Sequence, residues 1–212
     1  MKVISVIDCA TETLTNNCYN RLVDSFLIPM KFHCPSMFGM DSLTCDTSSA
    51  YIILGSYSNV EDRLSWQKEL AEFTHRKLNE GIPVLGICFG HQLMADYYGA
   101  KVTKNSGELP HNGVRKIKIE NEGEATFFVA HNFQVTDLPL YLERLATSKE
   151  CQNEIIAHTE LPFIGVQGHP EASKFFVSST LKDTLISKDQ QELAFKNGLN
   201  FIRNFLLKYE LL

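Results

Sequence analysis

One short stretch limits what this chain can fold into more than any other: residues 86–92, Gly-Ile-Cys-Phe-Gly-His-Gln. It overlaps the end of residues 83–87, a brief aliphatic run set off by Gly81, with the pattern of a fully buried parallel strand. Apolar residues at helical spacing come next, at Leu93, Met94, Tyr97 and Tyr98. A buried strand that turns sharply into a helix at Cys88 predicts a layered α/β fold.

The turn itself has the form of a nucleophile elbow. Its spacing, Gly-x-Cys-x-Gly, is that of the Gly-x-Ser-x-Gly elbow of hydrolases, with sulfur in place of oxygen. Gly86 and Gly90 permit the close backbone approach that such a turn needs. The turn would push the Cys88 sulfur out of the sheet, and the helix N-terminus would favour its thiolate form. A small cysteine at a strand end is also common in cores, so this motif alone leaves a packing role open.

A second motif favours a catalytic role for Cys88 over a packing role. Residues 165–171, Gly-Val-Gln-Gly-His-Pro-Glu, stand at the end of another apolar strand, 161–166. Acyl transfer by a thiolate needs an imidazole that takes and returns a proton, and a third group that orients the imidazole. His169 and Glu171 are residues of these two types. The two motifs together therefore predict a triad of Cys88, His169 and Glu171.

In this order, the two motifs resemble the Cys and His-Pro-Glu motifs of class I glutamine amidotransferases. The similarity runs from the first strand to the region of Glu171 and is closest to free-standing relatives of the glutaminase domain of GMP synthetase. It implies a three-layer, flavodoxin-like fold: a mostly parallel central sheet flanked by helices, with a small antiparallel meander. It also implies that Cys88 is the nucleophile, His169 the base and acid and Glu171 the orienting group, with neither a metal nor an organic cofactor.

The resemblance also implies an oxyanion hole. Family members carry a Gly-Gly-Pro loop at the position that follows residues 50–54 here, and one of its backbone N–H groups binds the developing oxyanion together with that of the residue after the cysteine. This chain has Gly-Ser-Tyr there. Gly55 or Ser56, with Phe89, are the candidates, each donor being worth about 3 kcal/mol in the transition state. In the absence of Cys88, a tight turn without chemistry would explain Gly55 equally well.

Three positions resemble the family's contacts to glutamine. Gln92, just after the elbow, matches the glutamine-binding position. Ala-His-Asn-Phe at residues 130–133 replaces the Ser-His-Gly-Asp of GMP synthetase-like members, so we expect Asn132 and Phe133 to contact glutamine. His131 is a rival base by chemistry alone, but it has no matching carboxylate motif nearby.

Length and composition exclude several classes of function. A chain of 212 residues with 44% hydrophobic residues can bury a full core, and we expect one domain over residues 1–212. A net charge of −5 without a basic stripe argues against nucleic acid as a partner. Residues 1–8 turn polar too early for a signal peptide, and no apolar stretch approaches a membrane span, so we expect a soluble, cytoplasmic protein. The spacing of the six cysteines favours neither zinc nor disulfides.

The remaining hydrophobic pattern predicts the elements around the two motifs. Residues 34–49 are expected to form a loop with a short helical turn. Residues 145–148, 154–158 and 163–166 suggest a small antiparallel meander that delivers His169. Further strands are expected at 3–7, 28–33, 50–54, from 99, at 113–119 and at 125–130, and helices at 13–26, 63–79, 173–186 and 187–209.

Three functions are open at this point. In the first, the chain is a glutaminase subunit that passes ammonia to a separate synthetase subunit, because it is too short for an ATP-activating domain and has no Gly-x-x-x-x-Gly-Lys-[Ser/Thr] loop. In the second, it is a free-standing hydrolase of γ-glutamyl peptides or conjugates. In the third, it is a binding or regulatory module on the same fold, with an idle Cys88.

Overall fold

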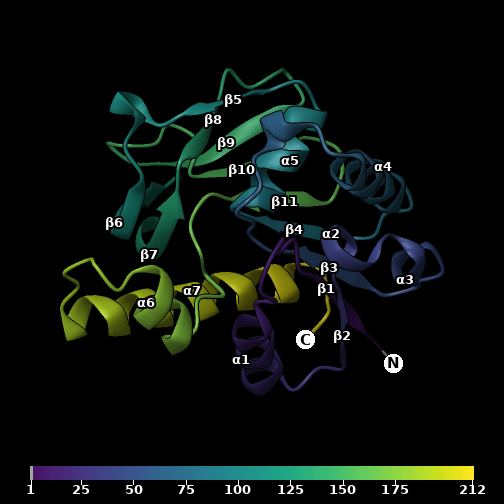
Figure 1. Ribbon diagram of the computed structural model, residues 1–212, viewed down its shortest axis with the longest axis horizontal. Helices are drawn as coiled ribbons and strands as arrows, with labels where there is room; N and C mark the ends of the chain where they lie inside the picture. Colours follow the sequence, from purple (N-terminus) through teal and green to yellow (C-terminus); the bar gives the residue numbers. More distant parts are fainter. Residues whose placement is uncertain (1) are drawn as a thin grey trace.

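The computed structural model describes residues 2–212 of the chain. Its elements, in chain order, are β1 (Ile4–Ile7), α1 (Asn16–Phe26), β2 (Met30–His33), α2 (Pro35–Phe38), α3 (Asp41–Thr44), β3 (Ala50–Ile53), η1 (Val60–Asp62), α4 (Ser65–Asn79), β4 (Val84–Ile87), α5 (Phe89–Tyr97), β5 (Lys101–Lys104), η2 (Ser106–Glu108), β6 (His111–Ile119), β7 (Gly123–His131), β8 (Phe133–Thr136), β9 (Leu142–Thr147), β10 (Ile155–His158), β11 (Phe163–Val166), α6 (Lys174–Thr180) and α7 (Lys188–Lys208). Figure 1 shows their arrangement.

Nine strands form one mixed sheet, in the order β2-β1-β3-β4-β11-β10-β9-β6-β7. The pairs from β2 to β11 are parallel, and those from β11 to β7 are antiparallel. Strands β4 and β11 are neighbours, with Ile87 opposite Val166, although they lie far apart in the chain. Because both strands run the same way, Cys88 and residues 167–171 emerge at the same carboxyl edge of the sheet, where open α/β sheets build their sites.

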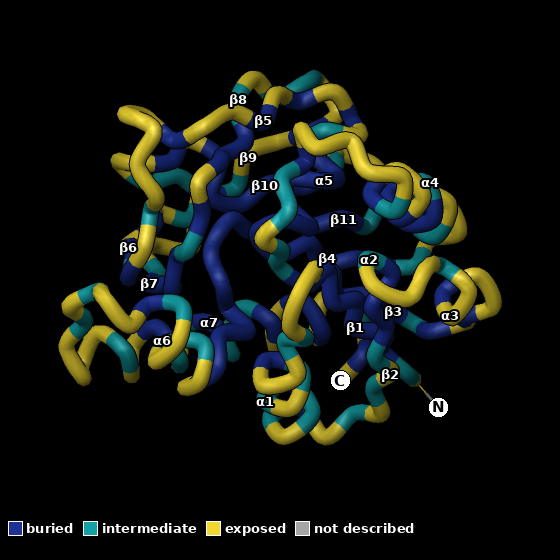
Figure 2. The backbone as a smooth tube through the Cα atoms, viewed as in Figure 1, coloured by how far each residue is buried: buried dark blue, intermediate teal, exposed yellow. Residues whose placement is uncertain are grey.

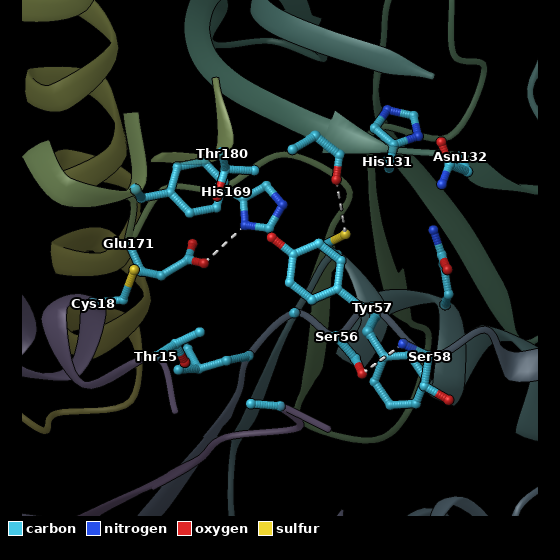
Figure 3. A pocket seen from close by; sticks show the side chains of 18 of the residues that line it. Thr15, Cys18, Ser56, Tyr57, Ser58, His131, Asn132, His169, Glu171 and Thr180 are labelled. Carbon is cyan, nitrogen blue, oxygen red and sulfur yellow. Dashed lines mark hydrogen bonds and ion pairs between the residues drawn. The ribbon is translucent and has the colours of Figure 1, made fainter. Parts of the chain in front are cut away.

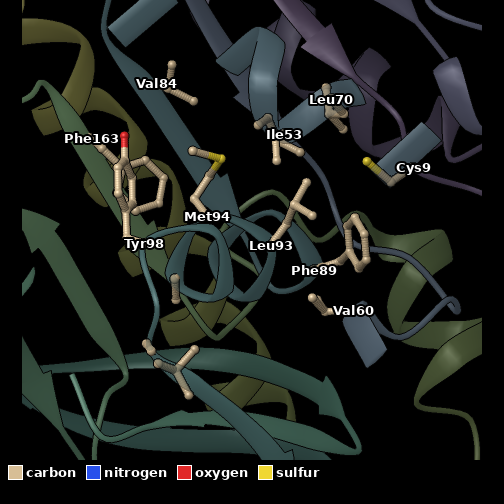
Figure 4. Packing of buried hydrophobic residues seen from close by; sticks show 14 of the residues in the cluster. Cys9, Ile53, Val60, Leu70, Val84, Phe89, Leu93, Met94, Tyr98 and Phe163 are labelled. Atoms are coloured by element: carbon tan, nitrogen blue, oxygen red, sulfur yellow. The ribbon is translucent and has the colours of Figure 1, made fainter. Parts of the chain in front are cut away.

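The buried strands supply side chains to both faces of the sheet. In β3, Tyr51 and Ile53 belong to an apolar cluster shared with α4 and α5, whereas Ile52 belongs to one shared with α1 and α7. Figure 4 shows the first cluster, in which Leu93 of α5 lies close to Ile53. Figure 2 shows the strands β1, β3 and β4 buried and the outward sides of the helices exposed. These three layers confirm the predicted fold class.

Several predicted elements form near their expected places. Helix α7 begins after Ser187, whose side chain accepts a hydrogen bond from Gln190 N while the Gln190 side chain bonds back, a capping box. The predicted meander is present as β9, β10 and β11, which pair antiparallel in that order. Among residues 2–212, none of the helices combines the length and the apolar content that a membrane-spanning helix requires.

Other boundaries differ from the prediction, for local reasons. Helix α1 begins at Asn16 rather than at residue 13, since the Asp8 carboxylate accepts hydrogen bonds from Ala10 N and Thr15 N and holds the preceding loop. Helix α6 ends at Thr180 rather than near residue 186; the Ser179 hydroxyl donates to the Phe175 carbonyl at 2.7 Å, a local bond that competes with helical ones. Residues 133–136, for which no strand was expected, pair with β5 as strand β8.

Candidate active site

Cys88 lies in a strained turn between β4 and α5. Its backbone has φ 50° and ψ −96°, a conformation that costs a residue with a side chain about 1–3 kcal/mol. The flanking glycines allow the close approach that this turn requires. A Cβ at position 86 would lie 2.7 Å from the Gly90 carbonyl, and one at position 90 would lie 2.6 Å from the Ile53 carbonyl oxygen. The sharp turn predicted from the sequence is therefore present.

His169 and Glu171 form a buried pair in the loop after β11. Nδ1 of His169 lies 2.9 Å from Oε1 of Glu171, and the His169 backbone N–H donates to the Phe128 carbonyl at 2.7 Å. The Nε2 atom is buried and has no hydrogen-bond partner among residues 2–212. Figure 3 shows this edge of the ring pointing away from Glu171 into the cavity. The imidazole therefore has one nitrogen fixed by a carboxylate and the other unpaired.

The pKa of His169 reflects this environment. Burial disfavours the charged imidazolium and lowers the pKa, but the interactions of the ring with Glu171 and Cys88 outweigh burial. The pKa consequently stands well above its ordinary value of 6.5. The direction of this shift favours the protonated ring. With Nδ1 bonded to Glu171, the unpaired Nε2 is the atom that can exchange a proton with a ligand in the cavity.

One cavity of about 440 Å³ joins these groups, since Cys88, His169 and Glu171 all line it. Gly55, on the loop after β3, lies close to residues of both motifs. A Cβ built there would lie 3.0 Å from His169 Cε1 and 3.7 Å from Cys88 Cβ. The imidazole and the cysteine thus reach the same point from two neighbouring strands.

The candidates for the oxyanion hole surround that point. Gly55, Ser56 and Phe89 line the cavity, and Phe89 is the first residue of α5, where helix N–H groups have no intrahelical partner. The Ser56 hydroxyl donates to the Cys9 carbonyl at 2.6 Å and accepts from Ser58 N at 3.0 Å, which holds this loop against the end of β1. These contacts fix the backbone from which an N–H could point at an oxyanion.

The three predicted contacts to glutamine occupy different environments. Asn132 is exposed and lines the cavity. Gln92 is buried, and its Nε2 donates to the Phe133 carbonyl at 2.7 Å and to Gln167 Oε1 at 3.2 Å. Phe133 reaches the cavity, but its ring packs in the apolar cluster of α5, and its carbonyl oxygen is already bonded by Gln92.

His131 does not compete with His169 as a base. Its Nδ1 lies 2.8 Å from the Phe133 carbonyl, and its Nε2 lies 3.0 Å from Nη1 of Arg115, which also donates to Glu154 at 3.0 Å. Burial, followed by the charge of Arg115, lowers the pKa of His131 to about 3. His131 is therefore neutral, and both of its nitrogens are occupied.

Two residues of the site have no role in the sequence-based prediction. Gln167 is fully buried, and its Nε2 lies 3.8 Å from the Cys88 sulfur. Arg21 of α1 donates to the carbonyls of Pro170, at 3.1 Å, and Ala172, and so holds the loop that carries Glu171. Gln167 stands inside the second motif and could have been found there. Arg21 is an isolated basic residue on a helix, and no sequence signal distinguishes it.

The sheet, the cysteine elbow and the neighbouring His–Glu pair define an α/β protein with its site at the carboxyl edge of parallel strands. Residues 5–187 match the family described as Glutamine amidotransferase class-I. The chain therefore belongs to the class I glutamine amidotransferase family, as the motifs indicated.

Its relatives include subunits of GMP synthase. The chain is 40% identical over 103 residues to a glutamine-hydrolyzing GMP synthase subunit from Methanococcus aeolicus, a match that covers 45% of this chain and 54% of that protein. It is 32% identical over 133 residues to the subunit of the same name from Methanopyrus kandleri, covering 59% of this chain and 68% of that one. The chain thus spans about half the length of the first relatives that it matches.

Solved structures resemble the whole chain. A glutamine amidotransferase from Thermotoga maritima has a TM-score of 0.71 at 16% identity, with 98% of this chain and 97% of that one covered. A glutamine amido transferase from Methylobacillus flagellatus has a TM-score of 0.69 at 17% identity, with 96% and 90% covered. At these identities the likeness supports the fold alone.

Proposed function

We propose that the protein hydrolyses the γ-amide of glutamine through Cys88, His169 and Glu171. One observation carries this proposal: the strained cysteine elbow and the buried His–Glu pair line the same cavity, with the imidazole Nε2 left unpaired. Membership of the glutamine amidotransferase family is consistent with it.

In the first half-reaction, the Cys88 thiolate attacks the γ-carbonyl carbon of glutamine. The carbonyl oxygen becomes an oxyanion, which backbone N–H groups of Phe89 and of Gly55 or Ser56 stabilise. The proton on Nε2 of His169 passes to the amide nitrogen, the C–N bond breaks, and ammonia leaves. The product on the protein is a γ-glutamyl thioester with Cys88.

In the second half-reaction, water replaces the sulfur. The neutral His169 left by the first step accepts a proton from water at Nε2, and the resulting hydroxide attacks the thioester carbon. The C–S bond then breaks, which releases glutamate and restores the Cys88 thiolate and the protonated His169. Throughout both steps Glu171 accepts the Nδ1 hydrogen bond, so that Nε2 always faces the reacting atoms.

The destination of the ammonia forms the second part of the proposal. Relatives at 32–40% identity carry the name of a glutamine-hydrolyzing subunit of GMP synthase. We infer that this chain likewise supplies ammonia to a separate synthetase subunit, with glutamine as the nitrogen donor. A low rate of glutamine hydrolysis that rises when the synthetase subunit binds is the expected behaviour of such a protein.

A second candidate, hydrolysis of γ-glutamyl peptides or conjugates, is favoured by the extent of the cavity. Beyond His169 the cavity continues along α6, where Phe176, Ser179 and Thr180 line it. A substituent on the γ-nitrogen of a glutamyl substrate would have room there. The catalytic steps would be the same, with an amine in place of ammonia as the leaving group.

One assay separates these functions. Release of glutamate would be measured for the purified chain with glutamine and with a panel of γ-glutamyl dipeptides, with and without a synthetase subunit, and with Cys88→Ala as the blank. Glutamine hydrolysis stimulated by the synthetase supports the first function, whereas faster turnover of dipeptides by the chain alone supports the second. If no substrate is cleaved faster than by Cys88→Ala under either condition, the proposed hydrolysis is wrong.

A further inference from the structure

A closed circuit of buried hydrogen bonds lies beside the cavity, and two of its members, His131 and Gln92, line it. On one side, Arg115 of β6 donates to Glu154 and contacts His131 of β7. On the other side, Gln92 of α5 bonds to Gln167, next to the nucleophile. All five side chains are at most 6% exposed. These groups therefore have little access to water, and each depends on the others for its hydrogen bonds.

The chemistry of its members fixes the direction of every bond. A guanidinium only donates, so Nε2 of His131 accepts from Arg115, and the ring's single hydrogen is on Nδ1. Nδ1 therefore donates to the Phe133 carbonyl. Since a carbonyl only accepts, the group of Gln92 that contacts the same oxygen is its amide nitrogen. The chain of bonds thus starts from a group whose charge state does not change.

The same logic continues to the sulfur. The amide nitrogen of Gln92 also lies 3.2 Å from Gln167, so the atom of Gln167 that it meets is the oxygen. The nitrogen of Gln167 then faces Cys88, 3.8 Å from the sulfur. With both hydrogens of Gln92 engaged, its oxygen is left as the acceptor for a ligand in the cavity that Gln92 lines.

Glu154 closes the circuit. Its carboxylate holds Arg115, and its backbone carbonyl accepts the N–H of Gln167 at 2.8 Å. The neighbouring Val166 carbonyl accepts the N–H of Cys88, also at 2.8 Å. One buried residue thereby fixes both the Arg115 end of the circuit and the backbone of Gln167.

We propose that Gln167 is a positioning residue of this site: it directs an N–H at the Cys88 sulfur and holds Gln92 with its oxygen toward the substrate. The inference rests on the proposed glutamine hydrolysis for its effect on substrate, but the contact with the sulfur exists without substrate. An N–H aimed at the sulfur stabilises the thiolate more than the thiol. Gln167 therefore favours the reactive form of Cys88.

Two variants separate the two contacts. Gln167→Met is close in shape and can neither donate nor accept strongly, so it removes both. Gln167→Glu keeps an oxygen that accepts from Gln92 but loses the N–H toward sulfur. The matched control is Gln134→Met, since Gln134 is also buried, lies on β8 and does not line the cavity.

The measured quantity is the pH dependence of alkylation of Cys88 by iodoacetamide, followed by mass spectrometry of the Cys88 peptide. The other titratable groups that line the cavity beside Cys88 are Cys18, Tyr57, His131, His169 and Glu171, and none of them is changed in these variants. In Gln167→Met we expect the midpoint to move to higher pH by about one unit, the shift that corresponds to loss of one hydrogen bond to a charged group. In Gln167→Glu we expect a larger shift in the same direction, because the new carboxylate adds a negative charge beside the sulfur. The control is expected to match the wild type.

Glutamine kinetics supply the second readout. The KM for glutamine is expected to rise about tenfold in Gln167→Met, where Gln92 is released, and to stay near the wild-type value in Gln167→Glu. Superimposed alkylation profiles for the wild type and both variants would overturn the proposal. If Gln167→Met does not fold, Gln167→Leu, which also lacks both polar atoms and adds no charge, decides the sulfur contact. If the wild type hydrolyses no glutamine, the proposed function fails, while the alkylation profiles still test the role of Gln167.

Discussion

Two buried clusters in this protein contain the residue types of a catalytic triad, and only one of them lines the cavity beside Cys88. Around β1, the Ser5 hydroxyl lies 3.0 Å from His33 Nε2 and donates to Asp46 at 2.8 Å. At the carboxyl edge of the sheet, Cys88 lines a cavity together with His169 and Glu171.

The two clusters differ in what is left unpaired. In the first, His33 has both nitrogens bonded, with Ser42 on Nδ1 at 2.9 Å, and the carboxylate bonds the hydroxyl and Lys31. No member lines the cavity beside Cys88. In the second, the carboxylate bonds the imidazole, and the far nitrogen has no partner among the described residues. The residue types of the two clusters are therefore alike, and the unpaired imidazole nitrogen beside a cavity is what distinguishes the second cluster.

Removing the imidazole should show the largest difference in activity between the two clusters. His169→Ala should lower kcat for glutamine by about 10⁴-fold or more, because no other group can protonate the leaving nitrogen. His33→Ala should leave kcat within about twofold and lower only the stability, since His33 contacts nothing in the cavity. Steady-state kinetics at one pH, with thermal melts of both variants, test this. A comparable loss of activity in His33→Ala would contradict the contrast.

The second largest effect on activity is expected at Glu171, the carboxylate beside His169. Glu171→Gln keeps the shape of the side chain but removes its charge, and we expect kcat to fall by about 10³-fold. Without that charge, the burial of His169 prevails, and its pKa should drop from well above 6.5 toward or below that value. A titration of the His169 ring by NMR measures the change. An unaltered titration midpoint would show that Glu171 does not hold the imidazolium.

In the cluster around β1, the largest effect is expected on stability. Burial alone would raise the pKa of Asp46, but hydrogen bonds from Lys31, Ser5 and Ser48 outweigh it and hold the pKa well below its ordinary value of 3.8. Ionised Asp46 therefore stabilises the fold above about pH 4, and this stabilisation is lost as the pH falls below that value. Asp46→Asn should cost about 2–3 kcal/mol at pH 7.

Urea denaturation of the wild type and Asp46→Asn at pH 7 and at pH 3 tests this linkage. The difference in unfolding free energy between the two proteins should be largest at pH 7 and shrink at pH 3. Catalytic activity at pH 7 should be unchanged. An equal difference at both pH values would mean that the charge of Asp46 does not carry the effect.

The smallest effect is expected at Ser5. Its hydroxyl contacts His33, Asp46 and Ser48, so Ser5→Ala should destabilise the protein by about 1 kcal/mol. The rate of glutamine hydrolysis should remain that of the wild type. A thermal melt and a single-substrate assay suffice, and a loss of activity without a loss of stability would place Ser5 in the chemistry after all.

The sequence indicates the positions of Cys88 and His169 at the sheet edge better than it indicates the hydrogen bonds around them. Cys88 and His169 each follow a short buried strand, and each belongs to a motif of contiguous residues that can be recognised in the sequence. The capping box of Ser187 is equally local. By contrast, the bonds of Arg115 with Glu154 and of Arg21 with the loop at Pro170 join distant segments. Single charged residues carry no periodicity, so only the folded packing discloses their partners.

The most direct test of the central claim is covalent labelling by a chloroketone analogue of glutamine, read by intact-mass and peptide mass spectrometry. Our account predicts one adduct per chain, located on Cys88, and none on the other five cysteines. The adduct should be lost in Cys88→Ala and form far more slowly in His169→Ala. Glutamate release that persists in Cys88→Ala, or a wild-type chain that gains no adduct on Cys88, would contradict it.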